Sequence, residues 1–196
     1  MIDVPGCDAL SSPDGVLYLT PKSAVPESKP RSLLFGGSAA APAEVPKAWP
    51  RMLAKSAVFT ITASNPMGVE KSASENAQAN MRLQKDIKNL FERPAPPRAW
   101  WHSFGFNVQE GWREDGFAIA YGVEERLFGL KDVLRLASKY NQAAVYMYRV
   151  VDGELVREVV WRHKSKQELY GAAPEKLAVL KQPPESKLAA RRLEPE

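Results

Sequence analysis

The sequence is poor in the residues that build metal centres and covalent cross-links. Its 196 residues include one cysteine, Cys7, and two histidines, His102 and His163. A single cysteine cannot form an internal disulfide, and no cysteine and histidine residues share the spacing of zinc ligands. We therefore predict no metal site and no cofactor, and a compartment that is reducing or in which cysteine chemistry plays no part.

Long apolar runs are also missing. No stretch approaches the roughly 18 to 20 apolar residues that a membrane-spanning helix needs. The first residues do not combine a basic segment with an apolar one, as a secretory signal does. The sequence favours a soluble protein, with peripheral membrane contact left open. An organellar location with the transit peptide removed is compatible with it.

Charge of one sign is not concentrated in any one segment. The formal net charge is +4, and the lysines and arginines are spread among acidic residues. Proteins dedicated to nucleic acid usually gather their basic residues in a patch. We therefore keep RNA binding as an alternative and not as the main prediction.

Proline divides the chain into three parts. Eight of the sixteen prolines lie in residues 1–50, and none lies between residues 98 and 173. We predict a Pro/Ser/Ala-rich extension over 1–50, an α+β domain over 51–162 and a polar extension over 163–196. Residues 174–180 are expected to form one or two helical turns.

The first extension buries too little apolar area to order itself without a partner. Residues 15–19 can form an isolated strand or an apolar anchor, and a second anchor precedes the Gly-Gly pair at 36–37. The side chains predicted to contact a partner from these two segments are Leu17, Tyr18, Leu34 and Phe35.

Hydrophobic periodicity predicts the elements of the central domain. Strands are expected over 55–63, 99–108, 112–121, 143–151 and 155–161, with an Asp-Gly hairpin turn before the last one. Helices are expected from Ser72 or Ser74 to about residue 91, and from residue 123 or 130 to residue 140. The order β-α-β-β-α-β-β predicts an α+β two-layer sandwich close to the ferredoxin-like split βαβ plan.

Asparagines occupy the apolar side of the first helix near its start. Leu83, Ile87 and Leu90 form an apolar stripe, and the same spacing extended backwards reaches Asn80 and Asn76. Together with residues of neighbouring elements they predict a polar cluster, whose members are Asn65, Asn76, Asn80, Glu114 and Gln142. The helix start offers free N–H groups to an anion, and the glutamate could act as a base or bind an amine. Alternatively, the amides cap the turn and fix the helix on the sheet.

Adjacent tryptophans in the 99–108 strand are a second candidate. Trp100 and Trp101 could stack on the bases of a single strand, but such side chains more often belong to a core or a partner contact. We predict that they bind a partner. No Ser/His/Asp or Cys/His set is apparent. The sequence therefore predicts no catalytic residue and favours a protein that is not an enzyme.

Taken in order, these motifs resemble a known family. The residues that carry the resemblance are Thr62, Ala63, Asn65, Pro66, Ser72, Glu75, Asn76, Asn80, Trp112, Glu114, Phe117, Tyr140 and Gln142. Their order and spacing are similar to those of domain-of-unknown-function family 3293, a family of small, mostly bacterial domains, over about residues 56–161. The resemblance implies an α+β domain and marks these positions. It implies no activity, substrate or cofactor.

The main functional hypothesis is a non-catalytic accessory or structural subunit of a larger assembly, such as an organellar photosynthetic, respiratory or ribosomal one. The α+β domain would dock on other protein subunits, and the extensions would run over neighbours. Two alternatives stay open. One is a small-ligand or nucleotide-binding domain, or an enzyme, that uses the polar cluster. The other is an RNA-binding protein.

Overall fold

The chain combines helices and strands, which confirms the α+β class. The computed structural model describes residues 7–12, 15–22, 43–44, 50–107, 110–180 and 187. The strands are β1 (Cys7–Ser12), β2 (Gly15–Pro21), β3 (Ala43–Glu44), β4 (Ser56–Ile61), β5 (Ala99–Asn107), β6 (Trp112–Gly122), β7 (Ala144–Val151), β8 (Glu154–Trp161) and β9 (Glu175–Leu180). The helices are α1 (Arg51–Ala54), α2 (Ala73–Asn89), α3 (Arg126–Lys139) and α4 (Lys164–Tyr170), with short 3₁₀ turns at Pro66–Gly68 and Leu90–Glu92.

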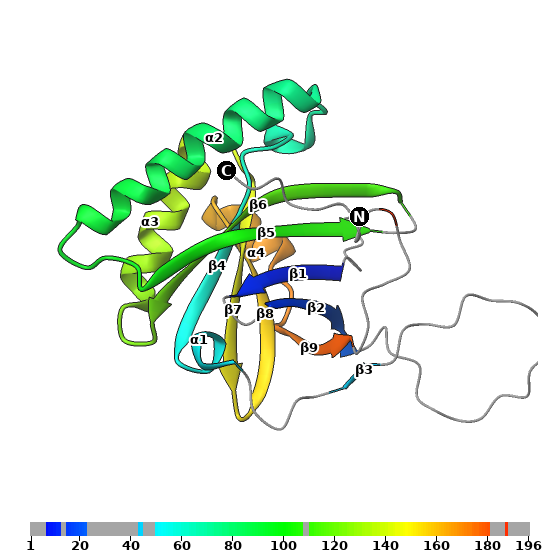
Figure 1. Cartoon of the computed structure of the whole chain (residues 1–196), viewed down its shortest axis with the longest axis vertical. Helices are drawn as coiled ribbons and strands as arrows, with labels where there is room; N and C mark the ends of the chain where they lie inside the picture. Colours follow the sequence, from blue (N-terminus) through cyan, green and yellow to red (C-terminus); the bar gives the residue numbers. More distant parts are fainter. Residues whose placement is uncertain are drawn as a thin grey trace, which may run out of the picture.

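All nine strands of the described residues belong to one antiparallel sheet. Their order is β2-β1-β5-β6-β4-β7-β8-β9-β3. Strand β2 also pairs with β9, where Leu19 lies opposite Val179. The sheet therefore curls back on itself, and strands from both ends of the chain complete it around the central ones (Figure 1).

Helices α2 and α3 cover one face of the sheet (Figure 1). Because side chains alternate between the faces of a strand, Phe59 and Ile61 of β4 point toward the helices. They pack there with Leu83 and Ile87 of α2 and with Val133 of α3. Each buried side chain of this size contributes about 1.5–3 kcal/mol. This core fixes both helices on the sheet.

A second apolar cluster fills the other face of the sheet, inside the curl. Val58 of β4 and Tyr148 of β7 belong to it, together with Leu19 of β2, Leu53 of α1 and Leu177 of β9. All five side chains are at most 3% exposed. The predicted two-layer sandwich is therefore too simple, because the sheet buries both of its faces.

The terminal segments depart from the prediction in two places. Residues 174–180 were expected to form helical turns, but Glu175–Leu180 form β9, in which Leu177 and Ala178 are buried. A short apolar run of this kind fits a strand as well as a helix, and pairing with β2 decides between them. Helix α4 also lies within the predicted polar extension. Residues 15–19 do form a strand, β2, but it is not isolated as expected, because it pairs with β1 and β9 and buries Leu19. Leu34 and Phe35 lie outside the described residues.

Local signals in the sequence placed several boundaries. Ser72, one of the two predicted caps, is the N-cap of α2. Helix α3 begins at Arg126, between its two expected starts. The β7–β8 hairpin turns at Asp152 and Gly153, with φ of 51° and 78°, as the Asp-Gly signal predicts.

Candidate functional site

The five predicted polar residues meet around the connection between β4 and α2. Asn65 lies within this connection, and Asn76 and Asn80 come from the first turns of α2. Glu114 comes from β6, and Gln142 lies between α3 and β7. The structure thus brings together side chains from segments almost 80 residues apart, and the hydrogen bonds show what each one does.

Asn80 holds the first part of the connection. Its Oδ1 accepts a hydrogen bond from the backbone N–H of Ala63 at 2.8 Å. Its Nδ2 donates to the Ser64 hydroxyl at 3.1 Å and to the Asp115 carbonyl at 3.0 Å. The amide uses both of its donor hydrogens and one acceptor on its own chain. Asn80 therefore ties the connection to β6.

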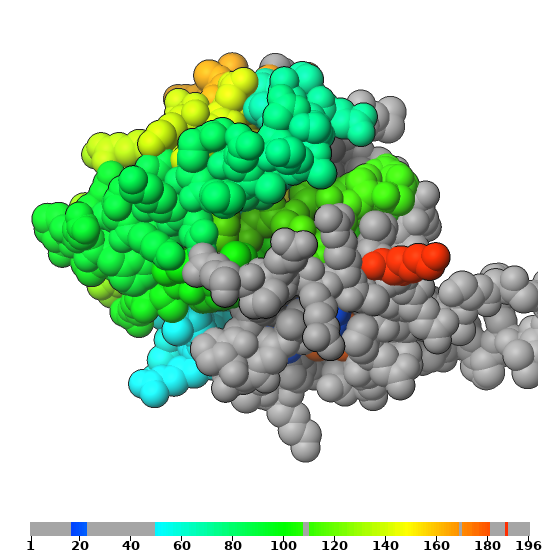
Figure 2. Space-filling model, turned by 45° about the horizontal axis from the view of Figure 1, so that its top comes forward, coloured from blue at the N-terminus to red at the C-terminus, as the bar shows by residue number. Residues whose placement is uncertain are grey.

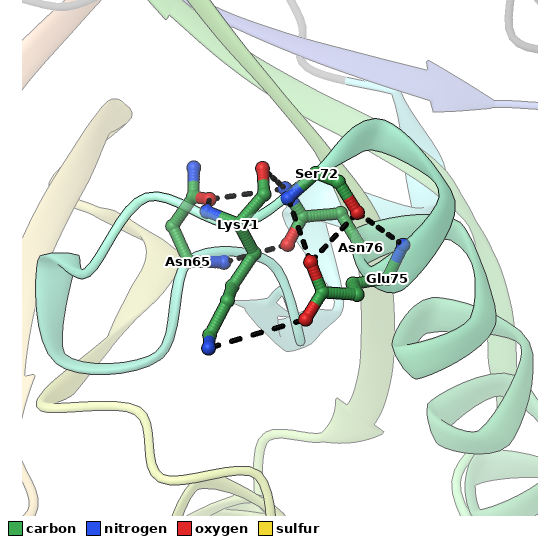
Figure 3. Close-up of polar contacts among 5 residues, drawn as sticks. All are labelled: Asn65, Lys71, Ser72, Glu75 and Asn76. Carbon is green, nitrogen blue, oxygen red and sulfur yellow. Dashed lines mark hydrogen bonds and ion pairs between the residues drawn. The ribbon is translucent and has the colours of Figure 1, made fainter.

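Asn65 and Asn76 bind each other (Figure 3). The backbone N–H of Asn65 donates to Asn76 Oδ1, and Asn76 Nδ2 donates to Asn65 Oδ1, both at 3.0 Å. Asn65 Oδ1 also accepts from the backbone N–H of Lys71 at 3.0 Å. Asn65 has φ of 45°, in the left-handed region that asparagine tolerates better than most residues. These bonds hold the turn against the helix.

Gln142 holds the same connection from the side of α3. Its Nε2 donates to the Ser64 carbonyl at 2.9 Å. The preceding residue, Asn141, accepts at its carbonyl from the Met67 N–H at 3.1 Å. The β4–α2 and α3–β7 connections are therefore joined at one end of the helical layer.

The start of α2 is occupied by the helix's own residues (Figure 3). The Glu75 N–H donates to the Ser72 hydroxyl at 3.2 Å, and the Ser72 N–H donates to Glu75 Oε2 at 3.0 Å. Hydrogen bonds from the Ser72 side chain and backbone hold the pKa of Glu75 below its ordinary value. A carboxylate of the chain thus already sits where an external anion was expected to bind.

Glu114 differs from the four amides because only one of its two carboxylate oxygens is hydrogen-bonded to a described residue. Asn65 Nδ2 donates to Glu114 Oε1 at 3.0 Å, and no cation pairs with Glu114 among the described residues. Burial raises the pKa of Glu114, and the bond from Asn65 opposes this rise only in part. Its second oxygen forms no hydrogen bond or ion pair with a described residue, and the side chain is partly exposed.

The aromatic candidates pack within this chain. Trp100 packs against the core beneath the helices, 5.8 Å from the Phe117 ring, and Trp101 packs against the core inside the curl. Leu17 is packed against the inner core, and the Tyr18 ring lies 6.4 Å from that of Phe104. Contact of these side chains with a partner stays a prediction.

The two histidines take no part in a metal cluster. His102 lies between aromatic rings, 6.0 Å from Trp100 and 5.1 Å from Phe117, and His163 is exposed before α4. Across the described ranges, no group of three or more His, Cys, Asp and Glu side chains could hold a metal ion. No helix in those ranges has the length and apolar character to span a membrane.

Sequence reasoning missed an exposed apolar surface at the start of α3. Val123, Leu127 and Phe128, which we call the α3 patch, are 58%, 68% and 60% exposed. Helical spacing places Leu127 on one face with Leu130, Leu134 and Ala137 and predicts that it is buried, but it faces solvent. The reason is Gly129, where an added Cβ would lie 2.5 Å from the Tyr121 ring. The backbone of α3 approaches the sheet at this glycine, which leaves its bulky neighbours outside.

Comparison with known proteins supports the family resemblance that the motifs predicted, but it assigns no function. Residues 61–145 match the model of a family described as "Protein of unknown function (DUF3293)". Neither a curated protein nor a solved structure matches the chain. The resemblance predicted from the sequence is confirmed over residues 61–145, a segment that contains all five residues of the polar cluster.

Proposed function

We propose that this protein is a non-catalytic accessory subunit that docks on another protein through the α3 patch. The observation that carries the proposal is the exposure of Val123, Leu127 and Phe128, each more than half open to solvent. Val123 and Leu127 are four residues apart, and Phe128 follows directly. Exposed apolar side chains that gather in one place mark interaction surfaces more often than single ones do.

The charge of the helical layer indicates the chemistry of the partner. Basic and acidic residues number three and two in α2, and four and one in α3. Two of the acids are engaged by their neighbours: Asp86 pairs with Lys139, and Asp132 pairs with Arg93 and Arg135. Lys131, by contrast, is exposed one turn beyond Leu127. The surface therefore fits a protein segment that combines apolar side chains with an excess of aspartate and glutamate.

The strand order supports an open outer surface on this layer. The order β7-β4-β6-β5, with α2 joining β4 to β5 and α3 joining β6 to β7, supports a ferredoxin-like split βαβ plan at the centre of the chain. In that plan one side of each helix packs on the sheet and the other is free. Figure 2 shows the outer surface of α2, coloured green, across the upper part of the molecule.

The test places a photo-crosslinking residue at position 128 and, as a control, at position 81. Met81 is also a large apolar side chain, 66% exposed, but it lies on α2 outside the patch. The substituted proteins are irradiated in the cells that make the protein, and crosslinked proteins are identified by mass spectrometry. We expect one discrete, acidic partner at position 128 and none at position 81. The same yield and products at both positions would contradict docking through the patch.

Direct binding of the purified partner completes the test. We expect the double variant Leu127→Ser, Phe128→Ser to bind the partner at least about tenfold more weakly, as loss of apolar hot-spot residues does. Met81→Ser should bind as tightly as the wild-type protein. Raising the salt concentration should weaken binding, because the charge component is screened. A partner that binds the double variant with unchanged affinity would overturn the proposal.

A further inference from the structure

A partly buried carboxylate lies near the other end of α3, beside the cluster that contains Gln142. Glu114 is partly buried in β6, and among the described residues its one hydrogen bond comes from Asn65 Nδ2 at 3.0 Å. Buried carboxylates are rarely left without a cation or a set of donors, because removing the charge from water is costly. From this geometry we infer that Glu114, positioned by Asn65, receives a cationic group, an ammonium or a guanidinium, from a ligand.

Asn65 is built to hold the carboxylate in one orientation. Its backbone N–H is bound by Asn76, and its Oδ1 accepts from Asn76 and from the Lys71 N–H. These bonds fix the side-chain amide and with it the directions of the two Nδ2 N–H groups. Oε1 of Glu114 accepts from one of these N–H groups, whereas Oε2 forms no bond with a described residue. Asn65 is therefore a positioning residue, and Glu114 is the group that contacts the ligand.

Two described cations close to Glu114 or Asn65 in the sequence are used elsewhere. Arg113 precedes Glu114 on β6, and its side chain points to the other face of the strand, where its Nε lies 2.7 Å from Asp115 Oδ1. Its guanidinium also lies 3.5 Å from the centroid of the Phe104 ring. Lys71, in the β4–α2 connection, extends toward Glu75 at 4.0 Å. Neither Arg113 nor Lys71 neutralises Glu114.

A positive charge is the complement that this carboxylate lacks among the described residues. The residue opposite Glu114 on β5 is Gly105, which has no side chain. An ammonium placed against Oε2 would form a charge-assisted hydrogen bond, and such bonds are about twice as strong as neutral ones. The incoming charge would also offset the cost of burying the carboxylate. A small cationic head group therefore fits the free oxygen better than a neutral one.

The site does not depend on the α3 patch. Helix α3 separates them, since Val123 precedes the helix and Gln142, which belongs to the Asn65 cluster, follows it. Fourteen helical residues extend about 21 Å. Substitutions at one site are therefore expected to leave the other unchanged, and the two proposals can fail separately.

The test titrates the full chain with methylammonium and methylguanidinium chloride at constant ionic strength. The ¹³C signal of the Glu114 carboxyl group, assigned from the variant that lacks it, reports the binding. We expect saturable binding, a lower apparent pKa of Glu114 when the probe is bound, and about tenfold or greater loss of affinity in Glu114→Gln. This variant keeps an acceptor for Asn65. Glu124→Gln, the same change at an exposed position, should bind like the wild-type protein.

A second arm identifies the source of the cation. Short blocked peptides that contain one arginine or one lysine are compared with the two small cations. Tighter binding of a peptide assigns the site to a protein side chain, and equal or tighter binding of the free cation assigns it to a small amine or guanidine. Equal binding to wild-type and Glu114→Gln proteins, or no change of the Glu114 signal, would overturn the inference.

Discussion

The side chains at the two ends of helix α3 differ in how many bonds they form within the chain. At its C-terminal end, the amides of Asn65, Asn76, Asn80 and Gln142 bind one another and the β4–α2 connection. At its N-terminal end, the α3 patch has large apolar side chains that face solvent. At the C-terminal end, most polar groups of the cluster are hydrogen-bonded within the chain. At the N-terminal end, the apolar side chains are exposed to solvent.

This difference changes which features point to function. Polar side chains in a cluster suggest a ligand site, but a connection without regular structure needs the same groups for its own backbone. Residues 62–65 satisfy part of this need with side chains of α2 and of the segment after α3. Within the described part of this cluster, one oxygen of Glu114 remains without a bond. We therefore expect substitutions of the amides to lower the free energy of unfolding strongly, and substitutions of the exposed groups to change it little.

Asn80→Ala is expected to have the largest effect. It removes three hydrogen bonds and leaves the Ala63 N–H without its partner, whereas the Asp115 carbonyl keeps the hydrogen bond from the Thr62 hydroxyl. We expect the free energy of unfolding to fall by about 2–4 kcal/mol. Chemical denaturation measures this value. The control is Asn89→Ala, an exposed asparagine at the end of the same helix, with an expected change within about 0.5 kcal/mol. Equal losses in the two variants would mean that the cluster does not hold the connection.

Ser72→Ala is expected to have an intermediate effect. It removes the side chain that caps α2 and accepts from the Glu75 N–H. We expect a loss of about 1 kcal/mol in the free energy of unfolding. Because the Ser72 hydroxyl also bonds to the Glu75 carboxylate, the pKa of Glu75 should rise toward its ordinary value, as NMR titration can measure. Ser74→Ala, two residues further along the exposed surface, is the matched control. If both substitutions cost the same, the capping box contributes nothing specific.

Local spacing in the sequence predicted the polar end well. Ser72 and Glu75 stand at capping-box spacing, and the backward extension of the apolar stripe found Asn76 and Asn80. Their convergence with Glu114 was also predicted, through the motifs shared with the family. Signals of this kind depend on residues near one another in the chain, or on a pattern already known as a whole.

Long-range packing could not be predicted from the sequence. The closure of the sheet by β2 and β9 joins residues about 160 positions apart, and nothing local in Leu19 or Leu177 indicates the pairing. The exposure of Leu127 depends on the close approach of Gly129 to Tyr121. The lack of a cation beside Glu114 among the described residues likewise follows from where Arg113 and Lys71 point. Each of these facts belongs to the assembled structure and not to a segment.

Glu114→Gln is expected to have the smallest effect on stability, and its sign is informative. Because burial raises the pKa of Glu114 in the folded protein, the folded state binds more protons than the unfolded chain between the two pKa values. Stability therefore falls as pH rises through this interval and stays lower above it. The glutamine has no such penalty, so the variant should be more stable than the wild-type protein at neutral pH. The difference should disappear below the pKa of the unfolded chain.

Denaturation curves of both proteins between about pH 4 and pH 8 measure this difference. Glu124→Gln, at an exposed position before α3, controls for the loss of one negative charge. A variant less stable than wild type at neutral pH would show that the carboxylate is already stabilised by a charge within the chain. That result would remove the reason to expect a cationic ligand, and the two ends of α3 would then differ only in the polarity of what they expose. A gain in stability would instead show that the protein carries a costly charge at this position, as binding sites often do.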